Sequence, residues 1–261
     1  MPSPMPALFV GHGTPMNTLE RNVNSNAWRR IAADLPRPEA ILAISAHWSI
    51  PGLAVTAMDR PATLHDFRGF PRELFEFRYP APGDPALAER VQALLAPLPV
   101  ASDLEWGLDH GTWSVLAHLY PGADIPVVHL SLDSTRPPAW HAELARHLGP
   151  LRDEGVLLLG SGNVVHNLRR MDLAHPECAL DWAARFSARV REALVAADLD
   201  ALVDFVSEEN PDEDARLAIP TPEHYLPLLY IAAQRREGED IRLFNDRVEY
   251  GSIGMLCCRV G

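Results

Sequence analysis

Cysteine is scarce in this sequence. Only three cysteines occur among 261 residues, and two of them, Cys257 and Cys258, are adjacent in the apolar stretch SIGMLCCRV. A disulfide framework or a cysteine-rich zinc module needs several cysteines at characteristic spacings. The sequence therefore argues against both, and we expect Cys257 and Cys258 to be buried thiols. If the chain binds a metal ion, histidine has to hold it.

Long apolar runs are also lacking. No run reaches the roughly 18 residues that a membrane-spanning helix needs, and the N-terminal segment MPSPMPALFVGHG has no positive charge ahead of its short apolar stretch. Neither a transmembrane helix nor a signal peptide is predicted. We therefore expect a soluble, cytoplasmic protein that does not bind membranes.

Positive charge is in the minority. Aspartate and glutamate outnumber lysine and arginine by 35 to 23, and the formal net charge is −12. We find no local basic stripe that would override this charge, which repels a phosphate backbone. Nucleic acid is therefore not an expected partner.

Short apolar runs alternate with helical patterns along the chain. Strands are predicted at residues 7–11, 40–45, 124–132 and 155–160, and helices at residues 27–35, 85–95, 138–147 and 180–197. This alternation predicts an α/β fold with a central, mostly parallel sheet, helices on both faces and a crevice at the carboxyl ends of the strands. A composition that is 47% hydrophobic suits one sizeable core, so residues 1–261 are predicted to form a single domain. A strand pair is expected after residue 241.

One long segment breaks this rhythm. Residues 64–83 (LHDFRGFPRELFEFRYPAPG) are rich in aromatics and arginines and end in a cluster of proline and glycine. Because long loops within a domain are often functional, we expect this segment to form a wall or lid over the crevice.

Four histidines lie where the predicted topology can bring them together. Two of them follow strands closely, a third comes after the strand GVLLLG and a short turn, and the fourth opens a predicted helix: His12 (VGHGTP), His47 (ISAHWS), His166 (GSGNVVHN) and His224 (TPEHYLP). Loops at the carboxyl ends of parallel strands converge on one crevice, and histidine is the commonest metal ligand. The sequence therefore predicts a metal site. A phosphate-binding loop around His12 is the rival interpretation, but the spacings GxGxxG and GxxxxGK[ST] are missing.

The local sequence suggests different roles for two of these histidines. Thr221 suits a helix N-cap and places His224 in the first turn, where the helix dipole keeps the ring neutral and able to bind a metal. Glu223 is the competing ligand. His166 follows the flexible turn SGN, which favours a general acid/base role over that of a ligand, with a pKa near operating pH.

Each of these histidines also has a purely structural interpretation, because most histidines bind no ligand. His47 could simply pack on Trp48, His166 could lie on a helix surface, and His224 could pack within its turn. Ser161 in LGSGN is the one serine that could act as a nucleophile, although it lacks a GxSxG elbow.

Among the other histidines, His110 in GLDHGTW is the most suggestive. It could hydrogen-bond an anionic substrate oxygen, or its loop could merely cap a helix predicted at residues 114–120 and leave the ring exposed. His65, beside Asp66, is a weaker candidate for substrate contact. The rest are expected to be structural or exposed: His118, His129, His141, His147 and His175.

The segments GHGTPMN, SAHWS, GLDHGTW, GSGNVVHNLR and TPEHYLPLL occur in this order between residues 11 and 229. Together they resemble the 4,5-DOPA extradiol dioxygenase family, which is one of the class III extradiol ring-cleaving dioxygenases related to the β subunit of protocatechuate 4,5-dioxygenase. The resemblance implies a catechol and O₂ as substrates and a mononuclear non-haem Fe(II) centre. Zn(II) could occupy the same site in the purified protein, since zinc stands above iron in affinity for nitrogen ligands.

The resemblance also implies roles for single residues. His12, His47 and His224 would bind the metal, and His166 would transfer protons or join as a fourth ligand. His110 would hold developing charge on the substrate. Two alternatives stay open: a zinc hydrolase that uses the same histidines, and a non-catalytic relative that binds a metal or a peptide.

Overall fold

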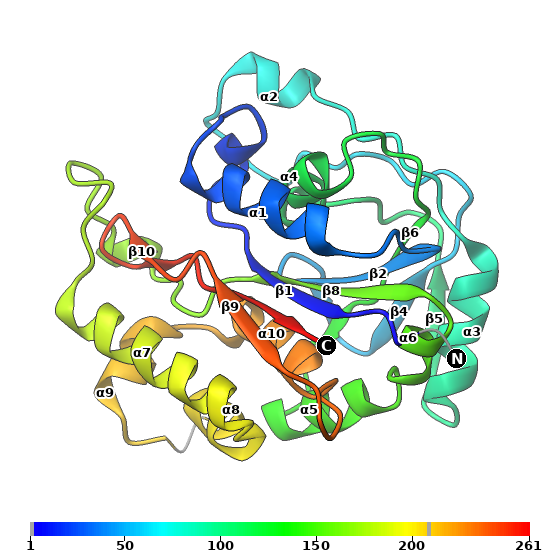
Figure 1. The fold of residues 1–261 in the computed structure, drawn as a ribbon. Helices are drawn as coiled ribbons and strands as arrows, with labels where there is room; N and C mark the ends of the chain where they lie inside the picture. The colour runs from blue at the N-terminus through cyan, green and yellow to red at the C-terminus, as the bar shows by residue number, and fades with distance from the viewer. Residues whose placement is uncertain (1–2, 208–209) are drawn as a thin grey trace.

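A six-stranded sheet forms the centre of this computed structural model, which describes residues 3–207 and 210–261 (Figure 1). The strand order is β6 (Val127–His129), β2 (Ala40–Ser45), β8 (Val156–Gly162), β1 (Ala7–Gly11), β12 (Cys257–Val260) and β9 (Ile241–Phe244). The first four strands run parallel, whereas β12 pairs antiparallel with both β1 and β9. The predicted α/β class and mostly parallel sheet are therefore confirmed.

Helices cover both faces of the sheet and bury a separate apolar core on each (Figure 1). One face carries α1 (Val23–Asp34) and α4 (His110–Leu119), and the other carries α5 (Pro138–Arg146) and α10 (Leu226–Ala232). Successive strand residues point to opposite faces, so Leu8 and Val10 join the first core while Phe9 joins the second. None of the helices in the described part of the chain combines the length and apolarity needed to cross a bilayer.

Smaller elements complete the fold. The other helices are α2 (Arg72–Glu76), α3 (Pro85–Leu95), α6 (Pro150–Asp153), α7 (Asp181–Ala196), α8 (Leu199–Phe205), α9 (Glu213–Ala218) and the 3-10 turns η1 (Pro15–Thr18), η2 (Leu168–Arg170) and η3 (Pro222–His224). Short strand pairs join β3 (Ser49–Ile50) to β7 (Leu132–Asp133), β4 (Leu53–Thr56) to β5 (Val100–Asp103), and β10 (Val248–Glu249) to β11 (Ile253–Gly254).

Most predicted elements lie within a few residues of their observed positions, with three informative differences. The strand expected at residues 124–132 is divided into β6 and β7. Pairing of β6 with β2 ends at His129, and the Ser131 N–H bonds to the Ala54 carbonyl of β4. The helix expected at residues 114–120 begins at His110, because Asp109 caps it by accepting from the Thr112 N–H. Strand β8 continues to Gly162. The expected C-terminal strand pair and the buried thiols are both confirmed.

A buried arginine, Arg152, connects the N-terminal segment to the end of α10 at the edge of the sheet where the parallel strands begin. The Arg152 side chain is 1% exposed and donates to the Met5 carbonyl at 2.7 Å and the Gln234 carbonyl at 2.6 Å. It also forms two hydrogen bonds with the Glu239 carboxylate, at 2.6 and 3.0 Å. A buried guanidinium is stable only while such partners satisfy it, so Arg152 links the segment before β1 to the end of α10.

Replacing this charge tests its structural role. We expect Arg152→Ala to lower the free energy of unfolding by about 3–5 kcal/mol, because it leaves Glu239 and two carbonyls without their partner. Arg146→Ala is the control, since its ion pair with Glu143 is exposed and should contribute less than about 1 kcal/mol. Urea titration followed by circular dichroism gives both values. Equal losses in the two variants would contradict the assignment.

Candidate active site

The carboxyl ends of β1, β2 and β8 open at one edge of the sheet, and the predicted histidines meet there. His12 directly follows β1, and its backbone N–H still bonds to the Gly162 carbonyl of β8. His47 comes two residues after β2. Together with residues from later in the chain, they line a pocket of about 360 Å³ that contains His12, His47, His110, His166 and His224. The predicted convergence of four histidines is confirmed, and His110 joins them.

Ser161 determines which nitrogen of His12 faces the pocket. The Ser161 hydroxyl donates to the Gly111 carbonyl at 2.6 Å, so its oxygen is left to accept from the His12 Nδ1–H at 2.9 Å. A hydroxyl has one proton to donate, and this assignment of the His12 tautomer follows from it. The Nε2 lone pair of His12 is therefore free. Ser161 orients a histidine here, and its engaged hydroxyl is not arranged as a nucleophile.

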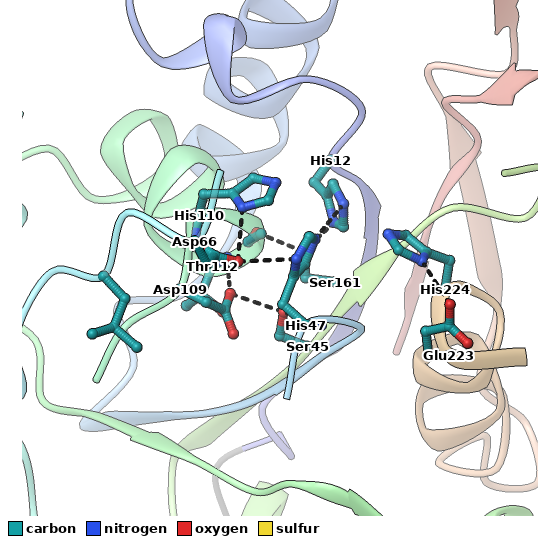
Figure 2. Close-up of polar contacts among 12 residues, drawn as sticks. His12, Ser45, His47, Asp66, Asp109, His110, Thr112, Ser161, Glu223 and His224 are labelled. Atoms are coloured by element: carbon teal, nitrogen blue, oxygen red, sulfur yellow. Dashed lines mark hydrogen bonds and ion pairs between the residues drawn. The ribbon is translucent and has the colours of Figure 1, made fainter. Parts of the chain in front are cut away.

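Asp66 contacts the next two histidines (Figure 2). Its Oδ2 lies 3.0 Å from Nδ1 of His47 and 3.0 Å from Nδ1 of His110, and its Oδ1 accepts from the His110 backbone N–H at 2.9 Å. Burial alone would raise the pKa of Asp66, but the hydrogen bonds from His110 and His47 outweigh it and hold that pKa far below its ordinary value. Asp66 is a site residue that the sequence patterns did not reveal, and its one signal is that it is a carboxylate in the segment that forms the wall.

The Nε2 atoms of His12 and His47 lie 3.3 Å apart. When both rings are neutral with the proton on Nδ1, two lone pairs face each other, and neither ring can donate a hydrogen bond to the other. Two nitrogens bound to one ion at about 2.1 Å lie roughly 3.0–3.4 Å apart at octahedral or tetrahedral angles. The pair is therefore spaced to share one metal ion.

A third ligand could come from either side of this pair. Ring nitrogens of His12, His47 and His110 all lie within 4.8 Å of one another. The predicted ligand His224 has its ring centroid 5.5 Å from that of His12 and 5.2 Å from that of His47, and Figure 2 shows its ring pointing towards them. Burial lowers the pKa of His224 to about 4, so the ring is neutral at pH 7 and can bind a metal.

The local structure around His224 differs from the expected helix start. His224 ends the 3-10 turn η3 rather than opening an α-helix, and Thr221 donates its hydroxyl to Glu223 rather than capping the turn. Burial, and not a helix dipole, is therefore the cause of its neutral ring. Glu223, the competing ligand, does not line the pocket, and its Oε1 lies 3.8 Å from Nδ1 of His224.

His166 stacks on His224. The two ring centroids are 3.4 Å apart with planes at 7°, and the His166 backbone N–H bonds to the Ala218 carbonyl. This residue is thus more firmly placed than the turn before it suggests. Burial, with smaller contributions from His224 and His47, lowers the pKa of His166 to about 3. This pKa lies below the near-neutral value that we expected, and the ring is neutral at pH 7.

Of the two residues predicted to contact substrate, the structure places His110 in the pocket and His65 outside it. His110 is buried at the start of α4 and lines the pocket, so the interpretation in which it is exposed is wrong. The structure does not bring His65 to the pocket, because its Nε2 bonds to the Phe77 carbonyl at 3.1 Å. The remaining histidines lie outside the pocket and are buried or exposed as expected: His118, His129, His141, His147 and His175.

The rest of the pocket wall is largely apolar. Phe67 and Phe70 come from the 64–83 segment, so its predicted role as a wall is confirmed. Leu168, Met171 and Ile253 also line the pocket. Glu249 is the one carboxylate among its described lining residues, which include no arginine or lysine, and it pairs with Arg247 outside the lining at 3.2 Å. Such a site suits a flat, apolar ligand that carries a few polar groups.

Comparison with known proteins agrees with this geometry. Residues 4–231 match the family described as the catalytic LigB subunit of aromatic ring-opening dioxygenase. The 4,5-DOPA dioxygenase extradiol of Escherichia coli (strain K12) is 48% identical over 261 residues, covering 98% of this chain and 95% of that protein. The 4,5-DOPA dioxygenase extradiol of Beta vulgaris is 40% identical over 230 residues, covering 84% and 83%.

A solved structure agrees as well. The crystal structure of an uncharacterized protein from Escherichia coli K12 superimposes with a TM-score of 0.86 at 46% identity, covering 98% of this chain and 100% of that one. Both the sequence and the fold are therefore shared over nearly the full length. The chain belongs to the LigB family of aromatic ring-opening dioxygenases and is an extradiol ring-opening enzyme.

Proposed function

We propose that this enzyme binds one non-haem Fe(II) ion and opens the ring of a DOPA-like catechol with O₂. The observation that carries the metal proposal is the pair of Nε2 lone pairs, on His12 and His47, that face each other at 3.3 Å. For two neutral rings this arrangement is repulsive, and a shared cation relieves the repulsion. The names of the relatives, 4,5-DOPA dioxygenase extradiol, support the substrate class.

His12, His47 and His224 are the residues that we propose to hold the metal. All three rings line the pocket, burial lowers the pKa values of His12 and His224 so that these two rings are neutral, and the His224 ring faces the other two (Figure 2). When bound, Fe(II) would bring the catechol oxygens and O₂ together and supply the electrons that activate O₂. Zn(II) in the same site would not, because zinc has no redox chemistry.

The other residues bind the substrate and move its protons. Phe67, Phe70 and Ile253 enclose an aromatic ring and exclude water. We propose that neutral His166 accepts a proton from one catechol hydroxyl and later returns it to the product. A catecholate next to His166 favours the protonated ring and offsets the effect of burial. His110, with its Nδ1 at Asp66, offers a Nε2 lone pair, so the neutral ring accepts a hydrogen bond from substrate. It would donate to an anionic oxygen only when doubly protonated.

The remaining predictions concern organisation and location. We propose that residues 1–261 act as one catalytic domain, in the cytoplasm, on a small molecule and O₂, without nucleic acid or membrane partners. The net charge of −12 supports the exclusion of nucleic acid. A zinc hydrolase on the same site is the second candidate, and the activities of the iron-loaded and zinc-loaded proteins distinguish the two.

Single substitutions test the metal ligands. We expect His12→Ala, His47→Ala and His224→Ala each to abolish stoichiometric metal binding, because two remaining nitrogens hold an ion poorly. Glu223→Gln and His110→Ala should retain it, and His65→Ala is the matched control outside the pocket. Metal analysis after dialysis gives the answer. Full retention in His224→Ala together with loss in His110→Ala would replace His224 by His110 in the ligand set.

A second variant tests proton transfer. His166→Ala should keep its metal and lose turnover by roughly 10²–10⁴-fold, which is the usual effect of removing a positioned acid/base residue. His175→Ala is the control, since that ring is exposed and pairs with Asp172. Steady-state oxygen uptake and metal content are measured on the same samples. Loss of metal in step with activity would make His166 a ligand.

The reaction itself can be observed directly. Fe(II)-loaded protein, prepared without oxygen and then given DOPA and a panel of substituted catechols in air, should consume O₂ and form a yellow ring-opened semialdehyde. The zinc-loaded protein should do neither. The proposal fails if the Fe(II) form is inert towards the whole panel while the zinc form hydrolyses an ester or amide, and the hydrolase would then replace it.

A further inference from the structure

The carboxylate of Asp66 makes three contacts that no assigned role explains. Its Oδ2 is shared by Nδ1 of His47 and Nδ1 of His110, each at 3.0 Å, and its Oδ1 accepts from the His110 backbone N–H at 2.9 Å. The two rings lie close together, with centroids 4.0 Å apart. The side chain of Asp66 is 19% exposed, so water competes weakly for these contacts.

We propose that Asp66 is a positioning residue that keeps the proton of both His47 and His110 on Nδ1, so that both Nε2 atoms present lone pairs to the pocket. An ionised carboxylate can only accept hydrogen bonds. With Nδ1 of each ring 3.0 Å from this charge, a lone pair on Nδ1 would face the carboxylate, so a neutral ring favours its proton on Nδ1 and has its acceptor on the opposite nitrogen. The inference rests on the proposed function only in taking His47 as a metal ligand.

The consequence is clearest at His47. Its Nε2 faces Nε2 of His12, and a proton there would occupy the space in which a metal ion is expected. Carboxylates that bond to the far nitrogen of a ligating histidine fix its tautomer and strengthen it as a ligand, and their loss typically reduces metal affinity or activity by about 10–100-fold. On the other side of the pair, Ser161 fixes His12 in the same tautomer through its hydroxyl.

Asp66 also connects the metal site to the pocket wall. It lies in the 64–83 segment next to Phe67, whose ring packs edge-on against His110 with centroids 5.6 Å apart. One side chain therefore orients a proposed ligand, orients a proposed substrate contact and anchors the wall. A simpler role has to be distinguished from this one: Asp66 could merely fasten the segment to the start of α4 through the His110 N–H.

Asparagine separates the two roles. In Asp66→Asn the side-chain carbonyl must stay on the Oδ1 side, because the His110 backbone N–H can only donate. The amide NH₂ then takes the place of Oδ2 and donates to both Nδ1 atoms, which forces the protons onto Nε2. In Asp66→Ala, water can accept or donate, so either tautomer is available. A tautomer role therefore makes asparagine the worse replacement, although it has nearly the shape of aspartate and preserves the anchor.

The experiment compares these variants by two readouts that do not need turnover. Zinc affinity is measured by chelator competition, and the histidine tautomers of the metal-free proteins are read from long-range ¹H–¹⁵N correlations, assigned with His47→Gln and His110→Gln. We expect Nδ1–H at both rings in the parent protein and Nε2–H in Asp66→Asn. Zinc affinity should fall by about 10–100-fold in Asp66→Asn and less in Asp66→Ala. Glu73→Gln, which neutralises an exposed carboxylate in the same segment, should change neither.

Two results would overturn the proposal. The first is the Nε2–H tautomer of His47 or His110 in the parent protein without added metal, read at a pH at which both rings are neutral, and this measurement needs no variant to fold. The second is zinc affinity that survives in Asp66→Asn and falls in Asp66→Ala, as an anchor alone predicts. Because neither measurement involves catechol or O₂, both are independent of whether the ring-opening reaction is observed.

Discussion

The parallel hydrogen bonding of β1, β2 and β8 is the interaction on which the site depends. In this ladder Gly11 lies opposite Gly162, and Ser45 lies opposite Ser161, so the three strands end almost level. The residues that follow them therefore start from one edge, and His12 and His47 need only one or two further residues to meet. A shift of one residue in either pairing would turn alternate side chains to the opposite face and separate the two lone pairs.

Small residues at that edge allow the other histidines to approach. A Cβ on Gly162 would lie 2.1 Å from the His224 carbonyl, and a Cβ on Gly111 would lie 2.9 Å from the Ser45 hydroxyl and 3.0 Å from the His47 ring. The distances of 2.1 and 2.9 Å are shorter than real contacts allow, and 3.0 Å is tighter than most of them. The Asn163 N–H then bonds to the His224 carbonyl at 2.8 Å and fixes η3 against the end of β8. The position of His224 thus depends on Gly162, and the close packing around His47 depends on Gly111.

Burial and hydrogen bonding together prepare the histidines for a metal. Burial is the largest cause that lowers the pKa of His12, His166 and His224, and each ring is neutral as a result. His47 is different: burial lowers its pKa, but the interaction of its ring N–H with the Asp66 carboxylate and the charge of Asp109 outweigh this and raise it. A neutral ring can carry its lone pair on either nitrogen. The acceptors behind the rings, Ser161 and Asp66, favour the tautomer whose Nε2 lone pair faces the pocket, and the apolar wall limits access of water.

The sequence by itself determined the α/β class, the strands that carry the site and the convergence of His12, His47, His166 and His224. Each of these follows from local patterns: apolar runs, the residues directly after them, and the convergence of strand ends in a parallel sheet. The start of α4 at His110 also had a local signal in its cap, Asp109, but the expected helix began later.

Only the tertiary structure decided which atoms face one another. Three sets of contacts join segments that share no sequence pattern. Asp66 contacts two histidines, His12 bonds to Ser161 across 149 residues, and His65 bonds to the Phe77 carbonyl instead of reaching the pocket. Tautomers and pKa values depend on such contacts and on burial, and neither quantity is encoded in a residue and its neighbours. Sequence therefore identified the residue types of the site, whereas packing between distant segments determined the protonation of the histidine rings and the direction in which their nitrogens point.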